Sequence, residues 1–268
     1  YYCTILFIGN ENLYICLRSY FFMILREVLQ SVVKSQKNGL ALFEQGVGRE
    51  TRTSIDLGLS HAVVLSGVRR CGKSTLLRQL MKESKSFCYF NFEDTRLAGF
   101  EPSDFHKLEE VLAEEYGVCG QYFFDEIQNA DKWEIFVRML LDKRKRVVIT
   151  GSNASLLSKE LGTRLTGRHL RFELFPFSFK EFLDFTGEKA GVKAFDDYFA
   201  RGGFPEYLKY GKADILRELL NDVVARDIVV RHRLRSDKIV REMALYLLSN
   251  VGKVFSFNGL KNIFSIGS

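Results

Sequence analysis

The most informative stretch of the sequence is Gly67-Val68-Arg69-Arg70-Cys71-Gly72-Lys73-Ser74-Thr75. It fits the pattern GxxxxGK[ST]. The run HAVVLS at 61–66 predicts a buried strand directly before it, and the apolar spacing of 73–82 predicts a helix directly after it. Two glycines in this setting let the main chain fold around an anion with its N–H groups pointing inward. We therefore expect residues 67–75 to hold the phosphates of a nucleotide.

Two side chains of this loop have expected roles in nucleotide binding. Lys73 would reach the β and γ phosphates, and the Ser74 hydroxyl would bind Mg²⁺. Arg69, Arg70 and Cys71 occupy variable positions of the pattern. For Cys71 we favour a tolerated small residue over a redox sensor.

A second stretch supplies the acidic groups that nucleotide hydrolysis needs. The apolar strand pattern at 121–124 is followed by Asp125 and Glu126. We expect Asp125 to support Mg²⁺, as a Walker B acid does, and Glu126 to act as the general base for a water molecule. An Asp-Glu pair after apolar residues is also typical of a strand that ends at solvent, so the prediction depends on the phosphate loop upstream.

A third buried strand ends in small polar residues, Thr-Gly-Ser-Asn at 150–153. Ser152 or Asn153 would orient the attacking water or touch the γ-phosphate. Asn153 is equally suited to capping the next helix, and the two roles are compatible.

Strand and helix patterns alternate through the first two thirds of the chain. We expect strands at 61–66, 86–92, 121–124, 146–150 and 169–175, with helices between them at 73–82, 102–115, 131–141 and 154–161. This alternation predicts an α/β fold with a mostly parallel sheet that helices cover on both faces. Helical patterns alone follow residue 177, at 179–185, 194–200, 213–234 and 238–248, which predicts a smaller all-helical subdomain. The proposed units are an N-terminal extension at 1–22, a core at 23–180, the helical subdomain at 181–252 and the start of a winged-helix-like segment at 253–268.

The extension at 1–22 contains two apolar runs that are both too short to span a bilayer, so we expect no membrane partner. We interpret this extension as upstream of a natural start near Met23, with a short packed strand or helix as the alternative.

Composition excludes several classes of protein. The chain has 268 residues, of which 46% are hydrophobic and 27% charged, so it is not a disordered or collagen-like polymer. Its net charge of +6 permits phosphate-bearing partners without demonstrating them. The cysteines lack CxxC spacing, and we interpret them as reduced thiols of a cytoplasmic protein without structural zinc: Cys3, Cys16, Cys71, Cys88 and Cys119.

The order of these motifs resembles the prokaryotic AAA-type P-loop ATPases, relatives of the archaeal-type ATPases that carry a C-terminal domain of unknown function. Further matching stretches are NFED at 91–94, LTGR at 165–168, LFPFSFKEF at 174–182 and GGFPE at 202–206. The resemblance covers about residues 23–268 and implies ATP and Mg²⁺ as ligands. It also implies that another strand separates the acidic strand from the strand of the phosphate loop. Family members continue into further C-terminal domains, so the chain looks truncated.

The same resemblance draws attention to Arg168. In AAA-type ATPases an arginine just before the last core strand often reaches the nucleotide of a neighbouring subunit. A guanidinium there would stabilise charge on the transferred phosphoryl group. Arg168 is therefore a candidate arginine finger in a homo-oligomer, with a salt-bridged surface arginine as the alternative.

Two functions remain open from the sequence. The first is Mg²⁺-dependent hydrolysis of ATP to ADP and phosphate. The alternative is a DNA-binding module switched by nucleotide with little turnover, suggested by the basic stretch at 226–235. A GTPase is disfavoured because no NKxD motif is present, and a small-molecule kinase because no acceptor site is identifiable. We expect GGFPE at 202–206 to form a structural turn rather than a catalytic site.

Overall fold

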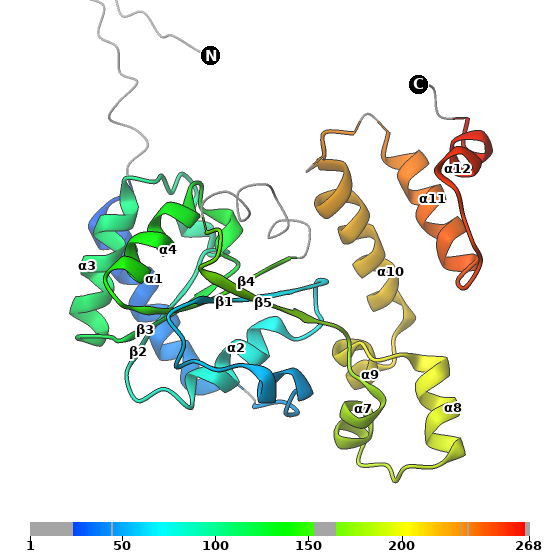
Figure 1. The fold of residues 1–268 in the computed structure, drawn as a ribbon, viewed down its shortest axis with the longest axis horizontal. Coiled ribbons are helices and arrows are strands. Elements are labelled where there is room, and N and C mark those ends of the chain that lie inside the picture. The colour runs from blue at the N-terminus through cyan, green and yellow to red at the C-terminus, as the bar shows by residue number, and fades with distance from the viewer. Residues whose placement is uncertain (1–23, 44, 153–164, 231, 235, 266–268) are drawn as a thin grey trace, which may run out of the picture.

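The computed structural model describes residues 24–43, 45–152, 165–230, 232–234 and 236–265. A five-stranded sheet lies at its centre, in the order β2-β3-β4-β1-β5, and all neighbouring strands are parallel (Figure 1). The strands are β1 (Ala62–Gly67), β2 (Phe87–Asn91), β3 (Gln121–Asp125), β4 (Arg146–Ser152) and β5 (His169–Leu174). The predicted parallel α/β fold is confirmed, and β4 separates the acidic strand β3 from β1.

Helices cover both faces of the sheet, as the uninterrupted apolar strands require. Alternate residues of each strand point to opposite faces, so Val64 and Phe124 pack in one apolar cluster, whereas Leu65 and Phe123 pack in the other. The first cluster is completed by α1 (Arg26–Gly39), α3 (Asp104–Tyr116) and α4 (Trp133–Asp142). The second is completed by α2 (Lys73–Met81) and by residues around η2 (Leu40–Leu42) and η3 (Glu50–Ser54).

The predicted element boundaries agree with the structure to within a few residues. The helix expected at 73–82 is α2, and the helix expected at 102–115 is α3, which begins at Asp104. The helix expected at 154–161 lies outside the described residues.

Only helices follow β5 among the described residues. They are α7 (Phe179–Thr186), α8 (Val192–Arg201), α9 (Pro205–Tyr210), α10 (Ala213–Asp222), the π-helical η6 (Val223–Val230), α11 (Asp237–Ser249) and α12 (Phe257–Ile263). Figure 1 shows α7, α8 and α9 grouped beside the sheet, with α10 rising from them. Phe177, Phe182 and Leu208 form their small apolar core. One helix was expected at 213–234, and the structure has α10 and η6 there.

The Gly-Gly-Phe-Pro-Glu segment, where a turn was expected, bends at Gly203 and leads from α8 into α9. The Phe177 N–H donates to the carbonyl oxygen of Gly203 at 2.7 Å. A Cβ at Gly203 would lie 2.2 Å from the Phe177 carbonyl oxygen, so only glycine fits this close approach. Pro205 then occupies the first turn of α9, where its missing N–H costs nothing.

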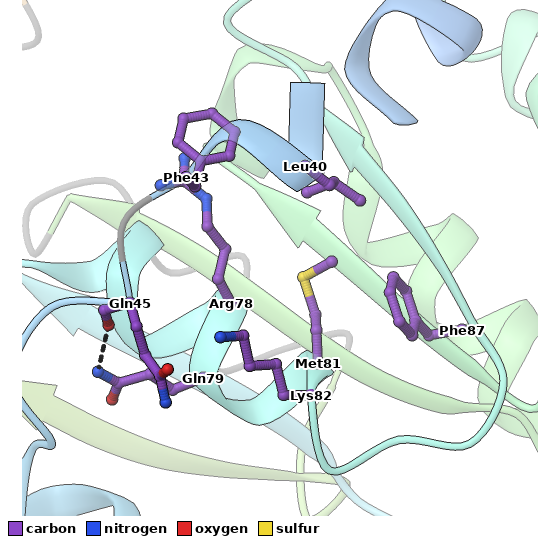
Figure 2. Close-up of a pocket in the computed structure, with 8 residues that line it drawn as sticks. All are labelled: Leu40, Phe43, Gln45, Arg78, Gln79, Met81, Lys82 and Phe87. Atoms are coloured by element: carbon purple, nitrogen blue, oxygen red, sulfur yellow. Dashed lines mark hydrogen bonds between the residues drawn. The ribbon is translucent and has the colours of Figure 1, made fainter. Parts of the chain in front are cut away.

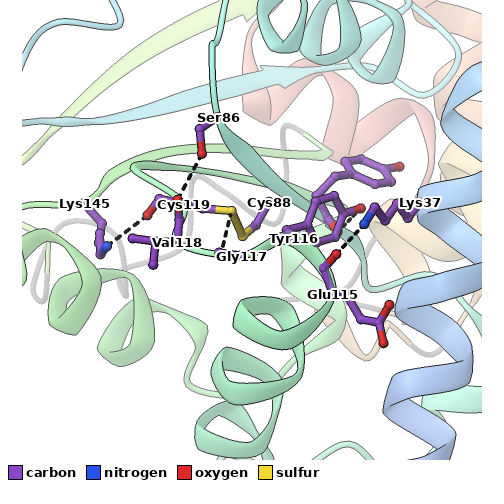
Figure 3. The surroundings of a disulfide bond; sticks show 10 residues. Lys37, Ser86, Cys88, Glu115, Tyr116, Gly117, Val118, Cys119 and Lys145 are labelled. Carbon is purple, nitrogen blue, oxygen red and sulfur yellow. Dashed lines mark hydrogen bonds between the residues drawn. A yellow bond between two sulfur atoms is a disulfide. The ribbon is translucent and has the colours of Figure 1, made fainter.

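A disulfide joins Cys88 of β2 to Cys119, just before β3 (Figure 3). The expectation that all cysteines are reduced thiols is therefore wrong for this pair. The two residues are far apart in sequence, and the pairing of β2 with β3 brings their Cα atoms to 6.0 Å. The disulfide also removes the thiol-based argument for a cytoplasmic location. Cys71 is a free, buried cysteine.

No helix within the described ranges combines the length and the hydropathy that crossing a bilayer demands.

Candidate functional site

The predicted phosphate loop joins β1 to α2 as expected. Gly67 ends β1, and α2 begins at Lys73. A Cβ at Gly67 would lie 2.3 Å from the carbonyl oxygen of Leu174 and 2.8 Å from the Cys71 sulfur, so a side chain does not fit there. Gly72 has φ +99°, in the left-handed region that favours glycine. Steric crowding thus explains the glycine at position 67, and the left-handed backbone explains the glycine at position 72.

Lys73 lies across the interior of this loop. Its side chain is buried, and its Nζ donates to the carbonyl oxygens of Gly67 at 3.2 Å and Val68 at 3.1 Å. The same nitrogen lies 4.0 Å from a carboxylate oxygen of Glu126. The structure therefore brings together two site residues that are more than fifty positions apart in the sequence.

Asp125 and Ser74 also meet. The Ser74 hydroxyl donates to Asp125 Oδ1 at 3.1 Å, and the Tyr89 hydroxyl approaches Oδ2 at 3.4 Å. The Asp125 side chain is buried at the end of β3. A hydroxyl and a carboxylate are hard oxygen donors of the kind that Mg²⁺ prefers, so the residues present fit the predicted metal.

Glu126 follows β3 in a left-handed backbone conformation, with φ +50°. Its side chain accepts a hydrogen bond from Gln128. Burial raises the pKa of the Glu126 carboxyl, and the positive charge of Lys73 opposes that shift without cancelling it. A raised pKa makes this carboxylate a stronger proton acceptor than an exposed glutamate.

Thr150 is a residue of the site that no sequence motif marks. Its hydroxyl bonds the Asp125 carboxylate and accepts from the Glu126 main-chain N–H at 3.0 Å. The expected site residues of the Thr-Gly-Ser-Asn stretch are Ser152 and Asn153. Ser152 ends β4, and Asn153 lies outside the described residues. The available signal was the strand order, because β4 and β3 are neighbours whose ends lie side by side.

The two loop arginines contact acidic residues of the helical segments. Arg69 makes a bidentate pair with Asp227 of η6, at 3.0 to 3.2 Å. Arg70 pairs with Glu206 at the start of α9. Beyond the loop, a Cβ at Gly46 would lie 2.9 Å from the Thr75 side chain, so the segment before β1 packs on the start of α2.

Arg168 lies at the other end of the sheet. It precedes β5, and its carbonyl oxygen accepts from Ala62, the first residue of β1. The phosphate loop follows Gly67, which pairs with Leu174 at the far end of β5. The Arg168 guanidinium pairs with Asp142 instead. Arg168 therefore does not reach the phosphate loop of its own chain.

A small pocket lies near the C-terminal end of α2, away from the phosphate loop (Figure 2). The Arg78 guanidinium lies 3.4 Å from the centre of the Phe43 ring, and Gln79 donates to the Gln45 carbonyl oxygen at 3.0 Å. No loop residue lines this pocket, so we do not assign it to the nucleotide.

Comparison with known proteins identifies the domain that carries this geometry. Residues 59–183 match the family described as "AAA domain". Over 217 residues the chain is 36% identical to an uncharacterized protein of Methanocaldococcus jannaschii, covering 75% of this chain and 49% of that protein. An uncharacterized protein of Haemophilus influenzae is 33% identical over 215 residues, covering 74% of this chain and 54% of that protein. The chain thus spans about half the length of these relatives.

Among solved structures, AMPPCP-bound DnaA from Aquifex aeolicus aligns with a TM-score of 0.43 and 15% identity, covering 90% of this chain and 77% of that one. The family match spans β1 to α7 and so includes the phosphate loop, Asp125 and Glu126. Together with the strand order and the loop between β1 and α2, the family match shows that residues 59–183 form an AAA-type domain with the P-loop fold.

Proposed function

We propose that the chain binds ATP with Mg²⁺ and hydrolyses it to ADP and phosphate. One observation carries the proposal. Lys73 lies 4.0 Å from Glu126, which directly follows β3, and Ser74 lies 3.1 Å from Asp125, the last residue of β3. Each of the four side chains is of the type that its expected role requires. The choice of ATP rests on the AAA family, because a phosphate loop does not read the base.

The chain's own residues supply most of the proposed chemistry. The loop N–H groups and the N-terminus of α2 bind the phosphates, and Lys73 neutralises the β and γ oxygens. Ser74 and Asp125 would hold Mg²⁺, which when bound offsets the charge of the phosphates. Glu126 accepts a proton from water while the water oxygen bonds to the γ phosphorus. The bond from that phosphorus to the bridging oxygen breaks, and ADP keeps the electron pair.

Two substitutions test this assignment. Glu126→Gln should keep ATP affinity within about threefold and lower kcat by about 10²- to 10⁴-fold, the usual range for a general base. Lys73→Ala should weaken ATP binding itself. Fluorescent-nucleotide titration and phosphate release measure the two effects, with the exposed Glu101→Gln as control. Normal turnover in Glu126→Gln would remove Glu126 from its role.

The second candidate is a nucleotide-switched DNA-binding module with little turnover. The observation that favours it is the stretch within and just after η6, where Arg226, His232 and Arg233 are exposed. Such a cluster would bind DNA phosphates in a salt-sensitive manner. DNA retention that changes with nucleotide would favour this function, and absence of retention at low salt would reject it.

The proposal includes a homo-oligomer in which Arg168 serves a neighbouring site. Its support is the position of Arg168 at the end of the sheet opposite its own loop.

A further inference from the structure

Arg49 is a buried arginine that joins three separate segments of the chain. It directly precedes η3 and is 5% exposed. Its Nε donates to Glu181 Oε1 at 2.9 Å, and its two terminal nitrogens donate at 2.6 Å to the carbonyl oxygens of Cys71 and Phe175. These partners lie in α7, in the phosphate loop and just after β5.

The bond to Cys71 bears on how the phosphate loop presents its amides. The Cys71 carbonyl and the Gly72 N–H belong to one peptide unit, and the described chain has no cis peptide bond. In a trans peptide the C=O and the N–H point in opposite directions. Holding the carbonyl toward Arg49 therefore turns the Gly72 N–H away from Arg49, on the opposite side of the peptide.

Arg49 also fills the space beside this peptide. A Cβ at Gly72 would lie 3.0 Å from a terminal nitrogen of Arg49. The guanidinium carbon lies 5.0 Å from the centre of the Phe177 ring, which limits its movement on another side. The guanidinium is thus held by hydrogen bonds in its plane and by packing.

Glu181 fixes the position of Arg49 in turn. Its Oε1 also accepts from the Glu50 N–H at 2.7 Å, and its Oε2 accepts from the Ser178 N–H at 3.0 Å, as part of the capping box of α7. Burial acts to raise the pKa of Glu181, but the hydrogen bonds from Arg49, Ser178 and Glu50 outweigh burial and lower it. The carboxylate is therefore ionised at neutral pH and balances the buried guanidinium.

We propose that Arg49 is a positioning residue of the nucleotide site, which holds the Cys71–Gly72 peptide so that its N–H is available to a phosphate. Glu181 sets this position from the first helix after the sheet. The inference rests on the proposed function, because it assigns a residue to the same nucleotide site. In this proposal Arg49 acts on the Cys71–Gly72 peptide and is not itself a ligand of the phosphates.

A role confined to general stability would have different consequences from a positioning role. Arg49→Lys keeps the charge opposite Glu181, but a single ammonium group does not reproduce the planar fork that bonds both carbonyls. Arg49→Met would leave Glu181 as an uncompensated buried charge, which is strongly destabilising. We therefore combine Arg49→Met with Glu181→Gln. Arg52→Met is the matched control, because Arg52 is an exposed arginine of η3 that also pairs with a glutamate, Glu83.

The first measurement is hydrogen exchange of the loop amides at 69–73 in the nucleotide-free protein. Both Arg49 variants should exchange these amides at least tenfold faster than the wild type, with the amides of β3 unchanged. The second is the ATP dissociation constant, which should rise about tenfold in Arg49→Lys and further in the double variant. Arg52→Met should stay within twofold in both measurements.

Each outcome bears on the proposal. Folded variants with wild-type loop exchange and ATP affinity would overturn it, and so would unfolding of both, because Arg49 would then serve the core as a whole. If the wild type itself does not bind ATP, the proposed function fails. The exchange data then decide separately whether Arg49 holds the loop.

Discussion

At the scale of single residues, Thr150 connects the two acidic groups of the candidate site. Its fully buried hydroxyl serves the Asp125 carboxylate and the Glu126 N–H together. Each of these groups would otherwise lose a partner in a region with little access to water. Buried polar groups without a partner are costly, so one hydroxyl stabilises the arrangement of both carboxylates.

Thr150→Val removes this hydroxyl while keeping the shape of the side chain. We expect the free energy of unfolding to fall by about 1–3 kcal/mol, the cost of leaving buried polar groups unsatisfied. ATP turnover should fall and require more Mg²⁺, because Asp125 loses a hydrogen bond that orients it. Urea denaturation and a Mg²⁺ titration of turnover measure the two effects. Thr150→Ser keeps the hydroxyl and should retain most of both properties, and a Thr150→Val protein equal to wild type would contradict the role.

The site residues that could be predicted from the sequence are those that lie within a local pattern. Lys73 and Ser74 belong to the loop motif, and Asp125 and Glu126 follow a recognisable strand. Thr150 bonds Asp125, 25 residues earlier, and Arg49 is held in place by Glu181, 132 residues later. Such roles arise from tertiary contacts, and no local pattern around Arg49 marks it. The strand order does indicate Thr150, because its strand, β4, lies next to β3, which ends at Asp125.

At the scale of elements, the Cys88–Cys119 disulfide ties β2 to the start of β3. Parallel neighbours need a crossover between them, and here the crossover contains α3. The disulfide closes this crossover into a loop with a sequence separation of 31 residues. Spacing alone did not reveal the pair, because it depends on the register of two strands that the sequence predicts only as separate elements.

Reduction of this disulfide should lower the free energy of unfolding by about 3–4 kcal/mol, from the gain in chain entropy of the unfolded state for a loop of this length. Chemical denaturation with and without dithiothreitol measures the loss. Cys119→Ser should show the lower stability already without reductant, and dithiothreitol should not change it further. A wild-type midpoint that is insensitive to reductant would contradict the predicted contribution.

The helices after β5 show that apolar spacing predicts where a helix lies but not its exact type. The strands and α7 were predicted from apolar spacing, which reports the face that each element buries. The change from α10 to the π-helical η6 at Val223 was not predicted. The apolar pattern continues through both segments, and Asp227 of η6 pairs with Arg69, 158 residues earlier. Local apolar spacing therefore predicts neither the contact with Arg69 nor the π-helical geometry of η6.

At the scale of the whole molecule, the sheet separates two groups that nucleotide hydrolysis would use. The phosphate loop follows the carboxyl end of β1, and Arg168 precedes the amino end of the neighbouring strand β5. Because β1 and β5 are parallel, the carboxyl end of β1 and the amino end of β5 lie at opposite ends of the strands. If Arg168 contributes to hydrolysis as proposed, it therefore does so at the site of another copy of the chain.

This separation leads to a mixing experiment with two inactive variants. Lys73→Ala lacks a working phosphate loop but keeps Arg168, whereas Arg168→Ala keeps the loop and loses the arginine. Each alone should have low ATP turnover, since an arginine supplied in trans accelerates phosphoryl transfer by about 10³- to 10⁵-fold in known cases. A mixture contains interfaces at which an intact loop faces an intact Arg168, so its turnover should exceed the sum of the two separate turnovers and rise with total protein concentration.

Arg217→Ala, which removes an exposed arginine paired with Asp214, controls for the loss of a surface charge. Turnover no greater than the sum would show that Arg168 serves only its pair with Asp142, because no arrangement of one chain brings that end of β5 to its own loop while the sheet stays paired.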